Sequence, residues 1–423
     1  MKKIGFLLIF FIFLALSSQA LAKKVLTLSE AVSLAIKANP QISSALKQRE
    51  EFFYQKNIIR AEFFPKIYLN YTYQRTDLGK NLPEYNTHLF GPFLTWNIFS
   101  GFSTYYAFKE ALYYLALQDE NLRGKINEIA LTTIKTYLDY FKEKSLLEAA
   151  LSDLEDAKNI LKLAKKRYEV GLSPYADVLD AEARLKEAEY KVTNYKYLSE
   201  ISKAKLLILL NEDLTKIEEY ELLPIEEKDL TLKALPEYIA KALKLRPEIL
   251  SKEKEILAQE SRLKSVRGEF FPSIDLFANY YKEDSKFFPD SNFQFQAGIK
   301  ITFPLFTGFS TVSKLQKERA TLEKKHFEKR ELELNIQHEV FSNYKIFETS
   351  RENLAASLAL LAKLEEDYRI MQKKYENGLA SIVDLTTVMA RLSEARSKVA
   401  LSKYDLIFNY YNLLKSTGEI PGL

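Results

Sequence analysis

The stretch Tyr168-Glu169-Val170-Gly171-Leu172 recurs as Tyr375-Glu376-Asn377-Gly378-Leu379, 207 residues further along the chain. From these stretches to Ala188 and Ala395, ten of 21 aligned positions are identical, where background residue usage gives about one or two. Glycine at this place indicates a turn after a helix, because glycine readily adopts the left-handed conformation of a helix cap. The chain therefore contains the same helix-turn-helix segment twice.

The same offset relates two other landmarks, so the repetition covers most of the chain. Phe63-Phe64-Pro65 recurs as Phe270-Phe271-Pro272, and Phe99-Ser100-Gly101-Phe102 recurs as Phe306-Thr307-Gly308-Phe309. A repeat of this length indicates one structural unit written twice. We expect the following divisions: a signal peptide at 1–22, repeat 1 at 23–211, an equatorial segment at 212–236, repeat 2 at 237–418 and a C-terminal tail at 419–423.

The first 22 residues are typical of a secretory signal peptide. Lys2-Lys3 precede an apolar run from Ile4 to Leu16, and Ala20-Leu21-Ala22 offers a small-residue cleavage site. Removing them leaves 59 of the 61 Lys and Arg side chains against 57 acidic ones, a balance that does not favour a nucleic acid partner. The chain has no cysteine, which excludes disulfides and thiolate metal sites.

Each repeat predicts the same order of elements: a short helix pair, two strands, a very long helix, a tight turn and a shorter helix. Ser29 is a candidate N-cap, and a helix from Pro40 to about Phe63 ends before Pro65. A strand over Lys66 to Thr76 and a second over His88 to Phe99 follow, and in repeat 2 the residues around Phe293 to Phe303 alternate in the same way.

Each strand has one apolar and one polar face, which fits either a soluble β-layer or a membrane barrel. An 11-residue strand is about 36 Å long and, tilted by about 45°, covers the roughly 25 Å apolar band of an outer-membrane barrel. Tyr68, Trp96, Tyr280 and Tyr281 are candidate interfacial aromatics. No segment after the signal has 18 consecutive apolar residues, so a mature chain that enters a membrane must do so as a closed barrel.

The long helix extends from Ser103 to Glu169, where the chain has no proline and a single glycine, Gly124. Its 67 residues form a helix about 100 Å long. Apolar residues spaced three and four apart predict coiled-coil seams on this helix, on its repeat and on the two return helices. The seams are Leu147, Ala150, Leu154, Ala157, Leu161, Ala164 and Tyr168; Leu354, Ser357, Leu361, Leu364, Tyr368, Met371 and Tyr375; Val178, Ala181, Leu185, Ala188 and Val192; and Leu385, Val388, Leu392, Ala395 and Val399.

Signal, duplicated element order, helix lengths and turn motifs together resemble the TolC-type outer-membrane efflux proteins, the outer membrane factor family. The resemblance covers essentially the whole mature chain. It implies an α+β membrane channel in which a duplicated helix-strand-strand-long helix-helix unit trimerises. Four strands and four helical wall elements per chain then form a 12-stranded β-barrel continuous with a 12-helix periplasmic α-barrel. Four strands alone cannot close, since transmembrane barrels need at least about eight.

The resemblance also implies a function and partners. The homotrimer is an exit duct in the outer membrane, with a large periplasmic portion and contact with outer membrane lipid, for efflux or type I secretion. Its periplasmic tips dock to an adaptor of the membrane fusion protein class and to an inner-membrane RND, ABC or MFS transporter. No cofactor or nucleic acid is implied, and the transported substrate is not specified.

The two hairpin tips are the candidate functional sites. Glycine and proline there suit a tight reversal by themselves, and the resemblance adds that the tips face the adaptor. The candidate adaptor contacts are Val170, Gly171, Leu172, Ser173, Pro174, Asn377, Gly378, Leu379, Ala380 and Ser381.

A periplasmic gate is the second candidate, formed by Asp177, Asp180, Tyr375 and Asp384. In a trimer each aspartate becomes a ring of three carboxylates that attracts cations, whereas in a single chain first-turn aspartates complement the helix dipole. The family's best-known members place an arginine where this chain has Ala380 and an aspartate where it has Thr387, so the closing network differs here and Asp180 is a candidate substitute.

An enzyme is not expected. The three histidines are dispersed and do not form a metal pair, and no phosphate-binding loop or nucleophile elbow occurs, so no catalytic, cofactor or metal residues are predicted. The remaining alternative is an exported coiled-coil adaptor or interaction protein without a membrane barrel. Its single hairpin flanked by β-domains does not match the duplicated strand pairs of this chain.

Overall fold

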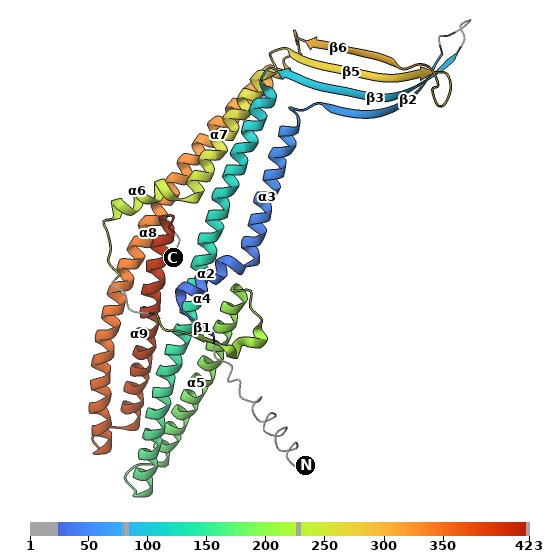
Figure 1. The fold of residues 1–423 in the computed structure, drawn as a ribbon. Coiled ribbons are helices and arrows are strands. Elements are labelled where there is room, and N and C mark those ends of the chain that lie inside the picture. Colours follow the sequence, from blue (N-terminus) through green and yellow to red (C-terminus); the bar gives the residue numbers. More distant parts are fainter. Residues whose placement is uncertain (1–23, 78, 80–83, 226–229, 420–423) are drawn as a thin grey trace, which may run out of the picture. The chain divides into compact units, whose positions relative to one another are not determined.

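A computed structural model describes residues 24–77, 79, 84–225 and 230–419 (Figure 1). The elements recur at the 207-residue offset: the 67-residue helices begin at Ser103 and Ser310, and both return helices have 35 residues. The elements are β1 Lys24–Leu26, α2 Leu28–Ala38, α3 Pro40–Ala61, β2 Lys66–Thr76, β3 Tyr85–Ser100, α4 Ser103–Glu169, α5 Tyr175–Leu209, η1 Leu214–Glu219, β4 Tyr220–Leu222, α6 Leu235–Leu245, α7 Pro247–Gly268, β5 Ser273–Asp284, β6 Gln294–Thr302, α8 Ser310–Glu376 and α9 Ile382–Ser416.

The contacts divide the chain into two compact units, and each unit contains segments from both repeats. One unit comprises 24–43, 125–246 and 336–419, and the other comprises 44–124 and 247–335. We refer to them as the hairpin unit and the sheet unit. The helices α4 and α8 contribute residues to both, because they have no internal proline that would end them.

The sheet unit contains a four-stranded antiparallel sheet in the order β2-β3-β5-β6. Cross-strand partners share a face, and the register pairs Ile67 with Leu94, Leu94 with Ala278 and Leu276 with Ile299. These residues define an apolar face, so the alternation predicted from the sequence is confirmed. The central junction β3-β5 joins the two repeats, and β2 and β6 form the edges of the sheet.

The candidate interfacial aromatics divide between the two faces of the sheet, which corrects the expectation from the sequence. Trp96 pairs with Leu276 and Tyr280 pairs with Phe295, so both lie on the apolar face. Tyr68 pairs with Phe93 and Tyr281 pairs with Gln294, so both lie on the opposite, polar face. The reason is the period of two: neighbours along a strand point to opposite sides.

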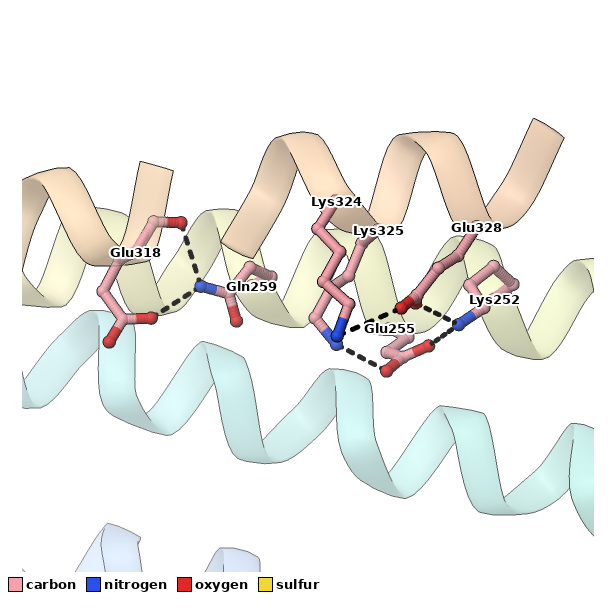
Figure 2. Close-up of polar contacts among 7 residues, drawn as sticks. All are labelled: Lys252, Glu255, Gln259, Glu318, Lys324, Lys325 and Glu328. Atoms are coloured by element: carbon pink, nitrogen blue, oxygen red, sulfur yellow. Dashed lines mark hydrogen bonds and ion pairs between the residues drawn. The ribbon is translucent and has the colours of Figure 1, made fainter. Parts of the chain in front are cut away.

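Within the sheet unit, α7 packs along α8 through a polar ladder (Figure 2). Glu255 accepts hydrogen bonds from Lys252 and Lys325, Lys252 also reaches Glu328 at 3.1 Å, and the buried Gln259 donates to the Glu318 carboxylate at 2.7 Å. The corresponding helix pair of repeat 1, α3 and α4, carries uncharged residues at these positions, such as Ala45 and Gln118. The two repeats therefore join equivalent helices by different chemistry.

The hairpin unit is built around α4, α5, α8 and α9. Its main core contains the seam residues of all four helices, with Ala164, Leu385 and Leu392 almost completely buried. The predicted seams are thus confirmed as the packing surface, apart from Tyr168, which is largely exposed. A second cluster packs α2 on α4 and α9. Beside it lies the short parallel pair β1-β4, in which the Leu26 carbonyl of β1 accepts a hydrogen bond from the buried Tyr137 hydroxyl.

Most element bounds agree with the sequence-based predictions to within a few residues. The strand Lys66–Thr76 and the helix Ser103–Glu169 agree at both ends, while β3 begins three residues before His88. The Ser29 prediction is wrong: Thr27 is the N-cap of α2, in a capping box with Glu30. Thr27 is the cap because Glu30 then stands at the third helical position, where its carboxylate accepts a hydrogen bond from the Thr27 amide. Residues 1–22 lie outside the described residues.

Within the described ranges, no helix combines the length and the apolar character that crossing a membrane requires.

Candidate functional site

Both hairpin tips close with the same backbone turn. In the first, the Leu172 amide donates to the Arg167 carbonyl at 2.8 Å and the Gly171 amide donates to the Tyr168 carbonyl at 2.9 Å. This pair of bonds is a Schellman motif, whose glycine must have positive φ, and Gly171 and Gly378 have φ of 73° and 75°. The glycines predicted from the repeat therefore terminate α4 and α8 for a stereochemical reason.

The two return helices begin differently. Ser381 caps α9 in a capping box: its hydroxyl accepts from the Asp384 amide at 3.1 Å, and the Asp384 carboxylate accepts from the Ser381 hydroxyl and amide at 2.7 and 3.0 Å. The hydrogen bonds from the Ser381 side chain and backbone hold the pKa of Asp384 below its usual value. Pro174 has the same place on α5 and provides no side-chain cap. Asp384 is therefore engaged within its own helix terminus.

Asp177 faces the other hairpin instead. The Tyr375 hydroxyl donates to Asp177 at 3.4 Å, a long contact between α8 and α5. Tyr375 is almost completely buried, and burial, followed by the nearby Asp177 charge, raises its pKa, so the hydroxyl keeps the proton that it donates. The structure thus brings together two of the four predicted gate residues.

The other positions of the predicted gate are not part of this contact. Asp180 is exposed one turn further along α5. The Thr387 hydroxyl donates to the Val383 carbonyl within α9 at 2.7 Å, and Ala380 packs partly against the hairpin core. Each of these two residues has a local role at the place where the best-known members of the resembled family have an arginine or an aspartate.

Arg167, which the sequence reasoning missed, connects the two tips. Its guanidinium donates from α4 to the Tyr375 and Glu376 carbonyls at 2.6 and 3.2 Å and lies 4.9 Å from the centre of the Tyr375 ring. The last carbonyls of a helix lack partners within it and favour a cation. An arginine is therefore present at the tip contact even though this chain has Ala380 where the best-known members of the resembled family have an arginine. The sequence signal was a basic residue in the last turn of both long helices, Arg167 and Lys374.

A second cross-hairpin contact was also missed. Arg396 on α9 donates to Asp153 and Asp156 on α4 at 2.7 and 2.9 Å, and Asp153 is almost completely buried. Burial raises the pKa of Asp156 despite the arginine, while the two carboxylates more than offset burial and raise the pKa of Arg396. Arg396 has two carboxylates as partners, so their attraction outweighs its burial, whereas Asp156 shares one cation with Asp153, so its burial outweighs the attraction of the arginine. At the 207-residue offset stand Glu189, Leu360 and Lys363, so only one side of the duplication has this cluster.

The predicted adaptor contacts include exposed apolar side chains at both tips. Val170, Leu172 and Leu379 are 68%, 67% and 78% exposed. Leu172 and Leu379 belong to the Schellman turns, whose hydrogen bonds use their amides and leave their side chains outside. Apolar side chains exposed together often indicate an interaction surface.

Among the described residues, no group of three or more His, Asp or Glu side chains is arranged to hold a metal ion.

Comparison with known proteins identifies the chain. The family model described as "Outer membrane efflux protein" matches residues 31–212 and 238–419. The protein CyaE of Bordetella pertussis is 21% identical over 400 residues, covering 93% of this chain and 84% of that protein. The alkaline protease secretion protein AprF of Pseudomonas aeruginosa is 20% identical over 401 residues, covering 90% and 82%.

A solved structure has the same fold. The outer membrane channel CmeC of Campylobacter jejuni superposes with a TM-score of 0.80 at 18% identity, covering 92% of this chain and 85% of that one. Both repeats match one family model of outer membrane efflux proteins, so the alternative of an exported coiled-coil adaptor is rejected. The chain belongs to the outer membrane efflux protein family and is an exit duct of the outer membrane, with a large periplasmic portion, not an enzyme.

Proposed function

We propose that three copies of this chain form one duct and that its hairpin tips dock to a periplasmic adaptor, which links it to an inner-membrane RND, ABC or MFS transporter. The observation that carries the docking is the exposure of the apolar side chains of Val170, Leu172 and Leu379, presented on two turns of the same geometry. A partner that recognises both tips meets nearly the same backbone twice. Segment 212–236, whose β4 pairs with β1, forms an equatorial collar around the duct.

The docking proposal is tested by charge substitution at the tips. We expect Leu172→Glu together with Leu379→Glu to abolish co-purification with the native adaptor and to stop export, because burying a carboxylate in an apolar contact is costly. Val25→Glu is the matched control, since Val25 is also exposed but lies in β1. Undiminished adaptor capture by the tip variant, with normal outer-membrane trimers, contradicts the docking surface.

We further propose that Asp177, Asp180, Tyr375 and Asp384 line a periplasmic gate. Support comes from the Tyr375–Asp177 contact between the hairpins and from the carboxylate rings that a trimer makes. Replacing the three aspartates with alanine should raise single-channel conductance in planar bilayers and weaken block by divalent cations. Ser381→Ala is the control, since it disturbs the same helix terminus without removing a charge. Unchanged conductance and block in the aspartate variant remove these residues from the gate.

A further inference from the structure

Four aromatic side chains lie on the polar face of the sheet, which we call the aromatic patch: Tyr68, Phe93, Phe277 and Tyr281. They occupy three neighbouring rows of the ladder, because Tyr68 pairs with Phe93 while Phe277 and Tyr281 lie one row to either side. Tyr68 is 50% exposed and the other three are half-buried. In a transmembrane barrel the apolar face contacts lipid and the polar face lines the interior. The rings therefore face the path of the exported molecules.

Two glycines position these rings. A Cβ at Gly298 would lie 2.7 Å from Cζ of Phe277, so the Phe277 ring lies over this glycine on the neighbouring strand β6. A Cβ at Gly91 would lie 2.2 Å from the Tyr280 carbonyl oxygen, so β3 and β5 approach closely beside Tyr281. The Tyr281 and Phe93 rings stack across these strands, with centroids 6.0 Å apart and planes inclined by 15°. The backbone thus holds the rings in a fixed arrangement.

The three rows that carry the rings are almost without charge. All of their residues are described, and the one charged side chain among them is Lys66, whose ammonium lies 2.7 Å from the Glu62 carboxylate. In the next row Asp275 pairs with Lys300. Neutral amide side chains surround the rings, namely Asn70, Asn279, Gln294 and Gln296. The patch therefore offers ring faces and neutral hydrogen-bonding groups, and no free cation in these rows.

We propose that the aromatic patch binds planar aromatic cations on their way out through the duct. A planar ring stacks on the side chains of Phe93 and Tyr281, and its positive charge is attracted by the negative faces of these rings. The lack of a free lysine or arginine in the three rows favours a cation over an anion. The inference names a substrate class and rests on the proposed trimer, which surrounds one lumen with three patches.

The strength of such contacts suits a conduit. A site along a pore has to favour the entry of its cargo and still release it. Contacts between a cation and an exposed ring are weak, whereas an ion pair with a buried carboxylate would be harder to break. The patch holds a passing cation by ring contacts, and the amides beside it replace part of its hydration.

Single-channel recordings in planar bilayers test the inference. Ethidium, a planar aromatic cation, is added on the extracellular side and compared with tetrabutylammonium, which has the same charge and no ring. Naphthalenesulfonate provides a planar ring of the opposite charge. We expect ethidium to block the open channel at concentrations at which the other two ions leave the current nearly unchanged.

Leucine substitutions remove the rings and keep apolar side chains. In Phe93→Leu/Tyr281→Leu the apparent Kd for ethidium should rise about tenfold, because two ring contacts in each copy are lost. Tyr280→Leu/Phe295→Leu is the matched control, since this pair of rings lies on the apolar face, and its block should equal that of the native channel. Tyr68→Leu is a milder variant of the patch with an expected rise of about threefold, and it serves if the double variant forms no channels.

The outcomes separate the patch from the duct. If ethidium blocks the native channel no better than tetrabutylammonium, or if neither patch variant weakens its block, the rings only pack the sheet and the inference is wrong. Equal block by naphthalenesulfonate overturns the assignment to cations. A native channel that conducts without block by ethidium leaves the trimeric duct standing, whereas a native protein that is monomeric and carries no current contradicts both.

Discussion

Replacing Arg396 with methionine should loosen the contact between the two hairpins. The guanidinium Nη1 lies 2.7 Å from Asp153 and 2.9 Å from Asp156, and the Asp153 side chain is 6% exposed. Methionine fills similar volume but leaves two carboxylates close together without a cation. Breaking a buried ion pair by removing one partner costs about 3–5 kcal/mol, because the remaining charge stays buried.

Hydrogen exchange of the α9 amides around Arg396 measures this cost. At about 1.4 kcal/mol for each factor of ten, the exchange through local opening should be roughly 10²- to 4 × 10³-fold faster in the variant. Arg369→Met is the matched control, because Arg369 pairs with Glu366 on the exposed surface of α8, where solvent screens the two charges. Its exchange should change by less than about sixfold.

Two further measurements separate charge from packing. Combining Arg396→Met with Asp153→Asn and Asp156→Asn should restore most of the protection, since neutral replacement of a whole buried cluster is often tolerated. Burial, followed by the neighbouring Asp153 charge, raises the pKa of Asp156, and removing Arg396 takes away the contributions that oppose this rise. The folded state is then favoured at low pH and loses stability as the pH rises through the folded pKa, so the defect should shrink on acidification. Wild-type exchange in Arg396→Met, or an equal defect in the neutral triple variant, refutes the argument.

Three more outcomes follow from individual contacts. Ser381→Ala should cost about 1 kcal/mol in thermal unfolding, because α9 loses its cap. The pKa of Asp384 is lowered in the folded chain, so the stabilisation by the cap should be present at neutral pH and lost as the pH falls through that lowered pKa. Gly378→Ala should cost about 1–2 kcal/mol, because φ there is 75° and a Cβ strains the left-handed turn, while Ala380→Gly serves as a composition control. Gln259→Leu should cost about 1–3 kcal/mol by leaving the Glu318 carboxylate without its donor, as seen by exchange of the α7 amides; an unchanged rate contradicts the hydrogen bond.

The elements that depend on local sequence could be predicted, and their agreement has a physical reason. The 67-residue helices follow from the absence of proline, and the glycine turns follow from the need for positive φ. The seams follow from the 3-4 spacing, which fixes one face of a helix regardless of its partner. The alternation of the strands was equally local. To assign each aromatic residue to a face, however, its position has to be counted along the strand, because successive residues point to opposite faces.

The contacts between hairpins could not be predicted in the same way. Arg396 is separated by 243 residues from Asp153, and Arg167 by 208 from Tyr375. Each is a charged residue near a seam, among many charged residues on long helices, and a single sequence does not say which of them turns inward. The gate residues show the same limit: Asp177 and Asp384 are equivalent by offset, but Ser381 engages one while Pro174 leaves the other free for Tyr375.

The equal lengths of the two hairpins constrain how this chain can change. Removing seven residues from both α4 and α5 keeps their seams in phase but shortens that hairpin by about 10 Å. Arg167 then no longer reaches the end of α8, and the two tips cease to be level. A change of length in one hairpin therefore has to be matched by the same change in the other, so the contact between the tips preserves the equal lengths of the two repeats.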